Sequence, residues 1–373
     1  MIALSKIALR TCLAALLLVP SANVIAASAA LPSPTRADCD RPEWQQVLRP
    51  ADPATAPAAA EAAWLDGRTL RWPGPTLSPG DRVEWVVQRP GQADEVMALQ
   101  AAAADPASSR RAPHIADGPT WQVPTGLSSA MLRALHRSAS HLRHVAADGT
   151  VRQRTEAQAA LALDDLFGTA ASDPRPLGAT LSSADGSAGR TTFRVWAPTA
   201  QRVWLCLHAD TGAPARALVP MQFEPRTGLW QHTAAGRLQG QAYTYLADVA
   251  VRGTGWVRNR VTDPYATALA TDSVRTVVAD LDDPALMPAG WRTTPSPHGR
   301  APHPVDMVIY ELHVRDFSVS DDSVPEAHRG KYLGFTHETS RGMQHLSALS
   351  KAGLTDVLLL PGCERATVPE TGC

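Results

Sequence analysis

The stretch Val308-Ile-Tyr-Glu-Leu-His-Val-Arg-Asp-Phe-Ser318 decides the fold class of the C-terminal part of this chain. Its β-branched and aromatic residues, followed by alternating apolar and polar ones, predict a strand rather than a helix. A helix is predicted next, capped by Thr339 or Ser340 and ended by Gly353. The apolar run 355–361 then predicts a second strand, of the kind that is buried on both faces of a parallel sheet. Strand, helix and strand in this order form a βαβ unit.

The same residues carry a resemblance to a known enzyme family. In order and spacing, the segments 310–318, 330–335, 353–355 and 359–361 resemble the opening of the catalytic barrel in type I pullulanases. Those are starch- and glycogen-debranching enzymes of glycoside hydrolase family 13. The resemblance implies that residues 305–373 are the start of a (β/α)8 TIM barrel. Because such a barrel needs about 250 residues, we expect this part of it to be incomplete.

The two carboxylates within residues 308–318 are not expected to form a catalytic pair. A retaining glycosidase needs two carboxyl groups about 5.5 Å apart. In the predicted strand Glu311 and Asp316 would face opposite sides, about 16 Å apart. The resemblance implies that the Asp nucleophile and the Glu acid/base of the family would lie beyond Cys373, so no catalytic residue is assigned.

Three polar residues of this strand are candidates for a supporting role. Alternation places Glu311, His313 and Arg315 on one face. In a parallel barrel, inward-facing charged side chains of this kind satisfy buried hydrogen bonds or support the site from below. We therefore interpret them as barrel-strand support.

The N-terminus reads as an export signal. Lys6 and Arg10 precede an apolar run at 12–19, and Ala27-Ser28-Ala29 offers a small-residue cleavage site, so residues 1–29 are predicted to be a signal peptide. The apolar run is too short for a membrane span. We expect a periplasmic or secreted protein. In such a compartment Cys39, Cys206, Cys363 and Cys373 allow one disulfide or free buried thiols, and their spacing does not decide between the two.

After a Pro- and Ala-rich arm up to about residue 57, residues 30–170 are predicted to hold a first, β-rich accessory domain. Short apolar segments separated by Asp66-Gly67 and Pro73-Gly74 predict a small β-sandwich. Trp64, Trp72 and Trp85 are expected in its core rather than on a sugar-binding surface. The resemblance matches this region to the accessory domain of pullulanases.

A helix is predicted over residues 127–145, because Met131, Leu135, Leu142 and Val145 would share one helical face. His136, His141 and His144 would then lie near its polar side. No carboxylate or thiol stands at ligand spacing from these histidines, so a solvated face is favoured over a metal site. We assign no metal site.

Residues 178–290 predict a second sandwich, of immunoglobulin type. Period-2 strands occur at 191–196 and 202–207, and further β signals follow at 228–230, 240–246 and 275–278. The strings 193–200, 240–245 and 263–266 resemble the family 48 carbohydrate-binding module, which precedes the barrel in debranching and branching enzymes.

Two tryptophans of this domain are candidates for glucan contact. Alternation puts Val203 and Leu205 on one face of their strand and Trp204 on the other, where its ring could be exposed. Trp230 sits beside a turn glycine and is the second candidate. For both, burial against a neighbouring domain is the alternative, and Trp196 is expected to be structural.

Charge and composition narrow the function further. A formal net charge of −1 without a long basic run argues against nucleic-acid or anionic-membrane binding and favours a neutral α-glucan as partner. No cofactor is evident, although the resemblance leaves calcium open, and the oligomeric state is not indicated.

The implied activity is hydrolysis of α-1,6-glucosidic linkages in pullulan, amylopectin or glycogen fragments, by retention. The chain itself is expected to be inactive. The alternatives are a non-catalytic α-glucan-binding β-sandwich protein and an exported β-sandwich protein with a structural or partner-binding role. A branching transferase is disfavoured by the export signal.

Overall fold

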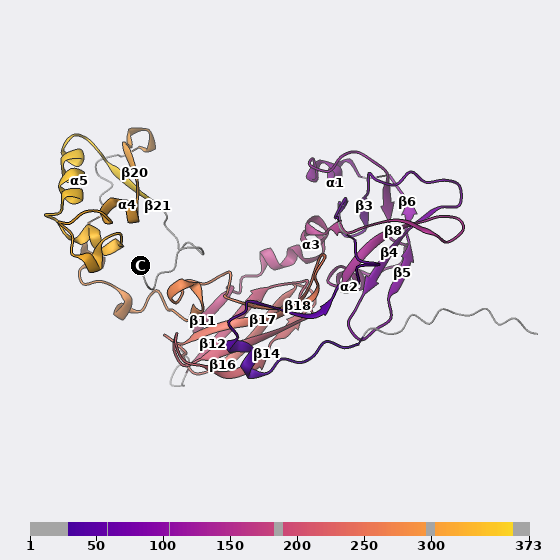
Figure 1. Cartoon of the computed structure of the whole chain (residues 1–373), viewed down its shortest axis with the longest axis horizontal. Coiled ribbons are helices and arrows are strands. Elements are labelled where there is room, and N and C mark those ends of the chain that lie inside the picture. The colour runs from indigo at the N-terminus through magenta and orange to yellow at the C-terminus, as the bar shows by residue number, and fades with distance from the viewer. Residues whose placement is uncertain (1–28, 58, 104, 183–188, 296–302, 361–373) are drawn as a thin grey trace, which may run out of the picture.

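The computed structural model describes residues 29–57, 59–103, 105–182, 189–295 and 303–360. They form two β-sandwiches and a smaller C-terminal unit, and Figure 1 shows the second sandwich between the other two parts. Nearly all of the signal-peptide prediction, together with Cys363 and Cys373, lies outside these ranges. Within them, no helix combines the length and apolarity that crossing a membrane requires.

The first sandwich contains nine strands and three helices among the described residues. The strands are β2 (Ala62–Trp64), β3 (Thr69–Arg71), β4 (Arg82–Gln88), β5 (Glu95–Ala98), β6 (Gln100–Ala101), β7 (Thr120–Gln122), β8 (Ala139–Val145), β9 (Val151–Thr155) and β10 (Ala157–Gln158). The helices are α1 (Pro106–Arg111), α2 (Ser129–His136) and α3 (Ala160–Phe167). One sheet has the order β10-β2-β3-β7-β6, with β10 and β2 parallel, and the other is the antiparallel sheet β5-β4-β8-β9.

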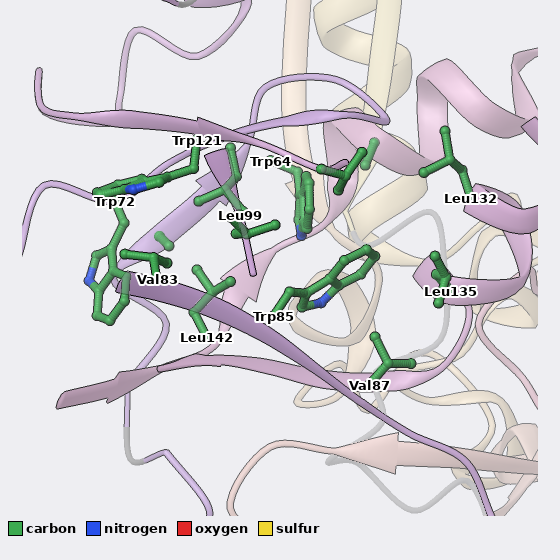
Figure 2. Packing of buried hydrophobic residues seen from close by; sticks show 14 of the residues in the cluster. Trp64, Trp72, Val83, Trp85, Val87, Leu99, Trp121, Leu132, Leu135 and Leu142 are labelled. Atoms are coloured by element: carbon green, nitrogen blue, oxygen red, sulfur yellow. The ribbon is translucent and has the colours of Figure 1, made fainter. Parts of the chain in front are cut away.

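Tryptophans fill the space between these two sheets, as the sequence predicts. Trp64, Trp72 and Trp85 are each at most 2% exposed. The rings of Trp64 and Trp85 come from opposite sheets, and their centroids lie 4.7 Å apart (Figure 2). Each aromatic side chain removes about 150–250 Å² from water, so this cluster dominates the core of the domain.

The single helix expected over 127–145 is wrong in its second half. Ser128 caps α2 by accepting a hydrogen bond from the Met131 amide at 3.2 Å, but the helix ends at His136. Residues 139–145 form β8 instead, which pairs with β4 on one side and β9 on the other. The apolar spacing of residues 139–145 is compatible with a helix, but these residues form a central strand. The reason is that the two neighbouring strands satisfy the backbone hydrogen bonds of this segment.

The second sandwich is built from ten strands among the described residues. They are β1 (Gln45–Pro50), β11 (Gly178–Ser182), β12 (Arg190–Trp196), β13 (Arg202–His208), β14 (Ala215–Pro220), β15 (Gln222–Glu224), β16 (Leu229–Ala235), β17 (Ala242–Val251), β18 (Gly255–Val261) and β19 (Thr276–Val277). One sheet has the order β1-β18-β17-β13-β14 with β19 beside β17, and the other is β11-β12-β16-β15. The 3-10 helices η1 (Arg36–Asp40), η2 (Gly168–Ser172), η3 (Thr271–Ser273), η4 (Pro284–Leu286) and η5 (Trp291–Thr293) lie around the sandwiches.

The N-terminal arm belongs to the second sandwich, although the predicted boundaries 30–170 place it with the first. Its strand β1 pairs antiparallel with β18, and a disulfide joins Cys39 of η1 to Cys206 of β13. Cys206 faces away from the sandwich core, which is what makes it available to the arm. The arm therefore lies on the second sandwich, the chain then forms the first sandwich, and it afterwards completes the second.

The C-terminal unit consists of β20 (Ile309–His313), α4 (Val314–Ser318), α5 (Arg341–Lys351) and β21 (Asp356–Leu360), with η7 (Pro304–Asp306), η8 (Glu326–His328) and η9 (Tyr332–Thr336). The strands pair in parallel. Ser340 caps α5, and the helix and second strand lie where the sequence predicts them. The first strand is shorter than expected, because His313 Nδ1 accepts a hydrogen bond from the Asp316 amide at 3.4 Å and a helix begins at Val314.

Candidate functional site

Trp204 lies on the outer face of the larger sheet of the second sandwich. Val203 and Leu205 point into the core, whereas Trp204 is half-buried on the opposite side, as alternation predicts. The guanidinium groups of Arg202 and Arg258 stand 5.0 and 5.3 Å from its ring. At such distances the cations are attracted to the π face of the ring. The indole is thus held in a fixed orientation with part of its surface in water.

The two arginines also anchor the arm on this face. Both bind the fully buried carboxylate of Asp248, with Arg202 Nη2 at 2.6 Å and Arg258 Nε at 2.8 Å. Their remaining N–H groups donate to the backbone carbonyls of Leu31 and Pro32. Buried charges are stable only when paired in this way. The charge network therefore fixes the arm and the orientation of Trp204 together.

Asp38 of η1 completes this network. Burial alone would raise the pKa of its carboxyl group, but hydrogen bonds from Thr35 and the charges of Arg41 and Arg258 outweigh burial and lower the pKa below its usual value. The carboxylate therefore stays ionised at neutral pH, next to the disulfide-bonded Cys39.

Trp44 is a second aromatic side chain on the same face, and it is not among the residues that the sequence predicts for glucan contact. It is 44% exposed, and the Arg260 guanidinium lies 4.1 Å from its ring centroid. Arg260, Leu246 and Trp204 occupy one cross-strand row of the sheet. The only sequence signal for Trp44 is its place just before a strand, and that strand pairs with residues more than 200 positions away, which a local pattern does not reveal.

Trp230, the other predicted candidate, is buried. It is 5% exposed, its Nε1 donates to the Ala197 carbonyl at 3.0 Å, and Phe223 packs on it at 4.8 Å. Arg137 of the first sandwich lies over the Phe223 ring and covers this side. Trp230 is thus buried against the neighbouring domain, which is the alternative to glucan contact that the sequence leaves open. This burial argues against a sugar-stacking role for Trp230. Trp196 is also in a structural position, with its Nε1 bonded to the Thr227 carbonyl.

The motif residues of the second sandwich form a buried hydrogen-bond cluster. The hydroxyl groups of Tyr243 and Tyr245 both donate to Asp263 Oδ2, at 2.8 and 2.9 Å. Burial raises the pKa of Asp263, and burial together with the charge of Asp263 raises the pKa of both tyrosines. Asp263 also accepts the Tyr265 amide, which closes the turn that follows β18. These residues stabilise the fold and do not present a surface.

The three polar residues of the C-terminal unit do not share a strand face. Glu311 is exposed on β20, and His313 ends that strand. Arg315 lies on α4 and is exposed, so its predicted place on the same face is wrong. Asp316 lies on α4 and not on β20, so the distance of about 16 Å that a continuous strand would place between Glu311 and Asp316 does not apply. A supporting role for these side chains stays a prediction.

The histidines of 127–145 are dispersed rather than clustered. His136 Nε2 bonds to the Gly67 carbonyl at 3.0 Å, and His144 Nε2 lies 2.8 Å from Asp81 Oδ2. His141 is buried on β8, so the expected solvated face is wrong for all three. Among the described residues no group of three or more His, Cys, Asp or Glu side chains is arranged to hold a metal ion.

Comparison with protein-family models matches each sandwich separately. Residues 59–165 match the pullulanase N2 domain, and residues 176–266 match carbohydrate-binding module 48, the isoamylase N-terminal domain. A pullulanase of Klebsiella pneumoniae is 35% identical over 323 residues, which are 84% of this chain. The chain belongs to the pullulanase family and corresponds to the N-terminal portion of its members.

Other pullulanases support the same assignment. Chloroplastic pullulanase 1 of Arabidopsis thaliana is 34% identical over 67% of this chain. The crystal structure of Klebsiella pneumoniae pullulanase complexed with maltotriose superposes with a TM-score of 0.74 at 34% identity, covering 85% of this chain. The chain spans 29% of the first relative, 25% of the second and 30% of the solved structure, so what it shares with these pullulanases is their non-catalytic N-terminal domains.

Proposed function

We propose that this chain is the glucan-handling N-terminal part of an exported debranching enzyme that hydrolyses α-1,6-glucosidic linkages in pullulan, amylopectin or glycogen fragments with retention. The observation that carries the proposal is the 35% identity to a pullulanase across both sandwiches and most of the chain. The described residues contribute substrate binding, whereas the carboxyl pair that a retaining mechanism needs is supplied elsewhere in such an enzyme.

The C-terminal unit fits the role of the first two strands of a (β/α)8 barrel. β20 and β21 are parallel and connected through helices, which is the repeating unit of that fold. Ile309 is 57% exposed and Leu358 47% exposed. Strands of a parallel barrel are buried on both faces, so these apolar side chains are suited to packing against further strands and helices.

Export is supported by the disulfide between Cys39 and Cys206. Disulfides persist in oxidising compartments such as the periplasm or the extracellular space and are rare in the cytosol. The bond therefore agrees with the signal peptide proposed for residues 1–29 and with a periplasmic or secreted location.

The glucan-binding surface is proposed to be the outer face that carries Trp204 and Trp44. Both rings are oriented by arginines and keep part of their surface in water, which is the arrangement that stacking on an apolar sugar face requires. A non-catalytic α-glucan-binding protein is the second candidate function, because this face alone would suffice for it.

Two assays on the full chain test these proposals. We expect retarded migration in an amylopectin-containing native gel and no release of reducing sugar from pullulan, with an intact pullulanase as positive control. Trp204→Ala and Trp44→Ala should each weaken the retardation severalfold, whereas Trp291→Ala, at a 66% exposed ring of η5, should not. Unchanged migration with and without amylopectin would exclude glucan binding. Pullulan hydrolysis at an enzyme-like rate would contradict the non-catalytic assignment.

A further inference from the structure

A cavity of about 390 Å³ lies where the two sandwiches meet. Its walls are the ends of β4 and β8 in the first sandwich, the turn between β17 and β18 in the second, and the segment 49–57 that connects them. The volume falls within the range of about 300–1,000 Å³ that is typical of small-molecule sites, which often occupy domain junctions. The cavity is distinct from the outer face of Trp204 and Trp44, neither of which lines it.

The junction around the cavity is held by specific contacts. Arg137 Nη2 donates to the Ala200 carbonyl at 2.6 Å, Gln201 Nε2 donates to the Arg137 carbonyl at 2.6 Å, and the Ala51 amide donates to the Thr254 carbonyl at 2.9 Å. These bonds connect both sandwiches and the connecting segment. The cavity walls are therefore fixed relative to one another before any ligand binds, which reduces the entropic cost of binding.

Five polar side chains at this cavity make no hydrogen bond to the rest of the described chain. They are Ser140 and His141 of β8, Glu156, Thr199 and Arg252. Other polar groups in the wall are already engaged, as Arg89 is with Glu95 and Gln88 with Asp94. Glu156 is half-buried, and its pKa is raised by burial and lowered in part by the charge of Arg252. Burial also lowers the pKa of His141 to about 4, so this imidazole is neutral at pH 7.

The chemistry of these groups suits a neutral polyhydroxyl ligand. The unengaged set offers donors and acceptors of both charge signs, so neither an anion nor a cation is favoured by the cavity as a whole. Sugar hydroxyl groups both donate and accept, and they can satisfy a carboxylate and a guanidinium together. Ala157 and Val251, which are half-buried at the cavity wall, add an apolar surface.

We propose that the cavity between the two sandwiches is a sugar-binding site of mono- or disaccharide size, in which Glu156 accepts and Arg252 donates hydrogen bonds to ligand hydroxyl groups. The inference goes beyond the proposed function, because it assigns a second site for small sugars at the domain junction. Since the ligand would contact both sandwiches, its binding also stabilises their association by mass action.

Calorimetric titration of the full chain with maltose tests this proposal. We expect saturable binding that Glu156→Gln and Arg252→Gln each weaken at least about fivefold, a loss of roughly 1 kcal/mol. Arg252 is exposed, so its replacement does not threaten folding. Glu61→Gln, at an exposed glutamate of the same sandwich outside the cavity, serves as the matched control and should bind maltose like the wild type.

The outcomes separate this site from the glucan-binding face. Trp204→Ala should weaken amylopectin retardation severalfold and leave maltose binding unchanged. If maltose does not saturate the wild type, or if both cavity variants bind it with wild-type affinity, the cavity is not a sugar site. Loss of maltose binding in Trp204→Ala alone would place the sugar on the outer face and also overturn the inference, without affecting the proposed function.

Discussion

Two helices of similar sequence pattern have opposite surroundings in this molecule. α2 in the first sandwich and α5 in the C-terminal unit both start at a serine cap, Ser128 and Ser340, whose hydroxyl accepts an amide hydrogen bond. α2 buries Leu132 and Leu135, which are 1% and 3% exposed, whereas α5 buries none of its residues. Local sequence therefore suffices to form both helices, and only one of them has an apolar layer to pack against.

The strands of the two regions repeat this contrast. Central strand β4 buries five consecutive residues between its neighbours and the core, but β21 buries none. The apolar run of β21 is typical of a strand covered on both faces. Stability in the sandwiches thus comes from closed cores, whereas the C-terminal unit depends on packing that the described residues do not supply.

Removing the disulfide should give the largest difference between the regions. Cys39→Ser with Cys206→Ser opens a link between residues 167 positions apart. Since long cross-links restrict the unfolded chain most, the second sandwich should lose about 2–5 kcal/mol of unfolding free energy. Denaturant unfolding measures this loss. Wild-type protein whose disulfide has been reduced in the unfolded state should show the same loss of unfolding free energy. Cys363→Ser should not lower the unfolding free energy in this way.

A sandwich that keeps its full stability without the bond would show that the buried Asp248 network alone retains the arm. Hydrogen exchange of β1 amides would then distinguish the two cases, because those amides are protected only while β1 stays paired with β18.

A matched pair of leucine substitutions tests the contrast directly. Leu142→Ala, at a fully buried side chain of β8, should destabilise the first sandwich by about 2–5 kcal/mol, since it leaves a cavity in a closed core. Leu358→Ala, at a side chain 47% exposed on β21, should cost less than about 1 kcal/mol. Thermal unfolding of both variants measures the difference. Equal losses would mean that Leu358 is buried in solution and that the C-terminal unit has found an apolar partner.

Local patterns in the sequence predicted much of the fold for a physical reason. The tryptophan core, the alternation of Val203, Trp204 and Leu205, and the cap of α5 all depend on neighbours within a few residues. The strand–helix boundary at Val314 and the break between α2 and β8 were missed, because backbone hydrogen bonds decided them against the side-chain pattern.

The candidate site was only partly predictable, since it is assembled from distant segments. Nothing near Trp44 or Cys39 indicates that the arm crosses to β18 and β13. Likewise, Trp230 looks exposed beside its turn glycine until Arg137 of the other sandwich covers Phe223 next to it. Burial across a domain boundary depends on how the two sandwiches pack together. The alternation of residues along one strand therefore does not predict it.

Acid should weaken the first sandwich through its buried histidines. Burial lowers the pKa of His136 to about 4, although the Gly67 carbonyl partly offsets this effect. In the unfolded chain the pKa is about 6.5, so below that pH the unfolded state binds a proton that the folded state does not. Stability contributed by the neutral side chain is therefore complete above pH 6.5 and is lost as the pH falls towards 4.

Between pH 6.5 and 5 the expected loss from His136 is about 2 kcal/mol. Ionised carboxylates with lowered pKa values, such as Glu84, do not contribute in this window, because they are protonated only at lower pH. His136→Gln should have a lower melting temperature at pH 7, owing to the altered contact with Trp64 and Trp85, but a flatter dependence on pH than the wild type. Parallel pH profiles for the two proteins would show that His136 is protonated in the folded state, and the tryptophan core would then have to be more accessible to water than its burial indicates.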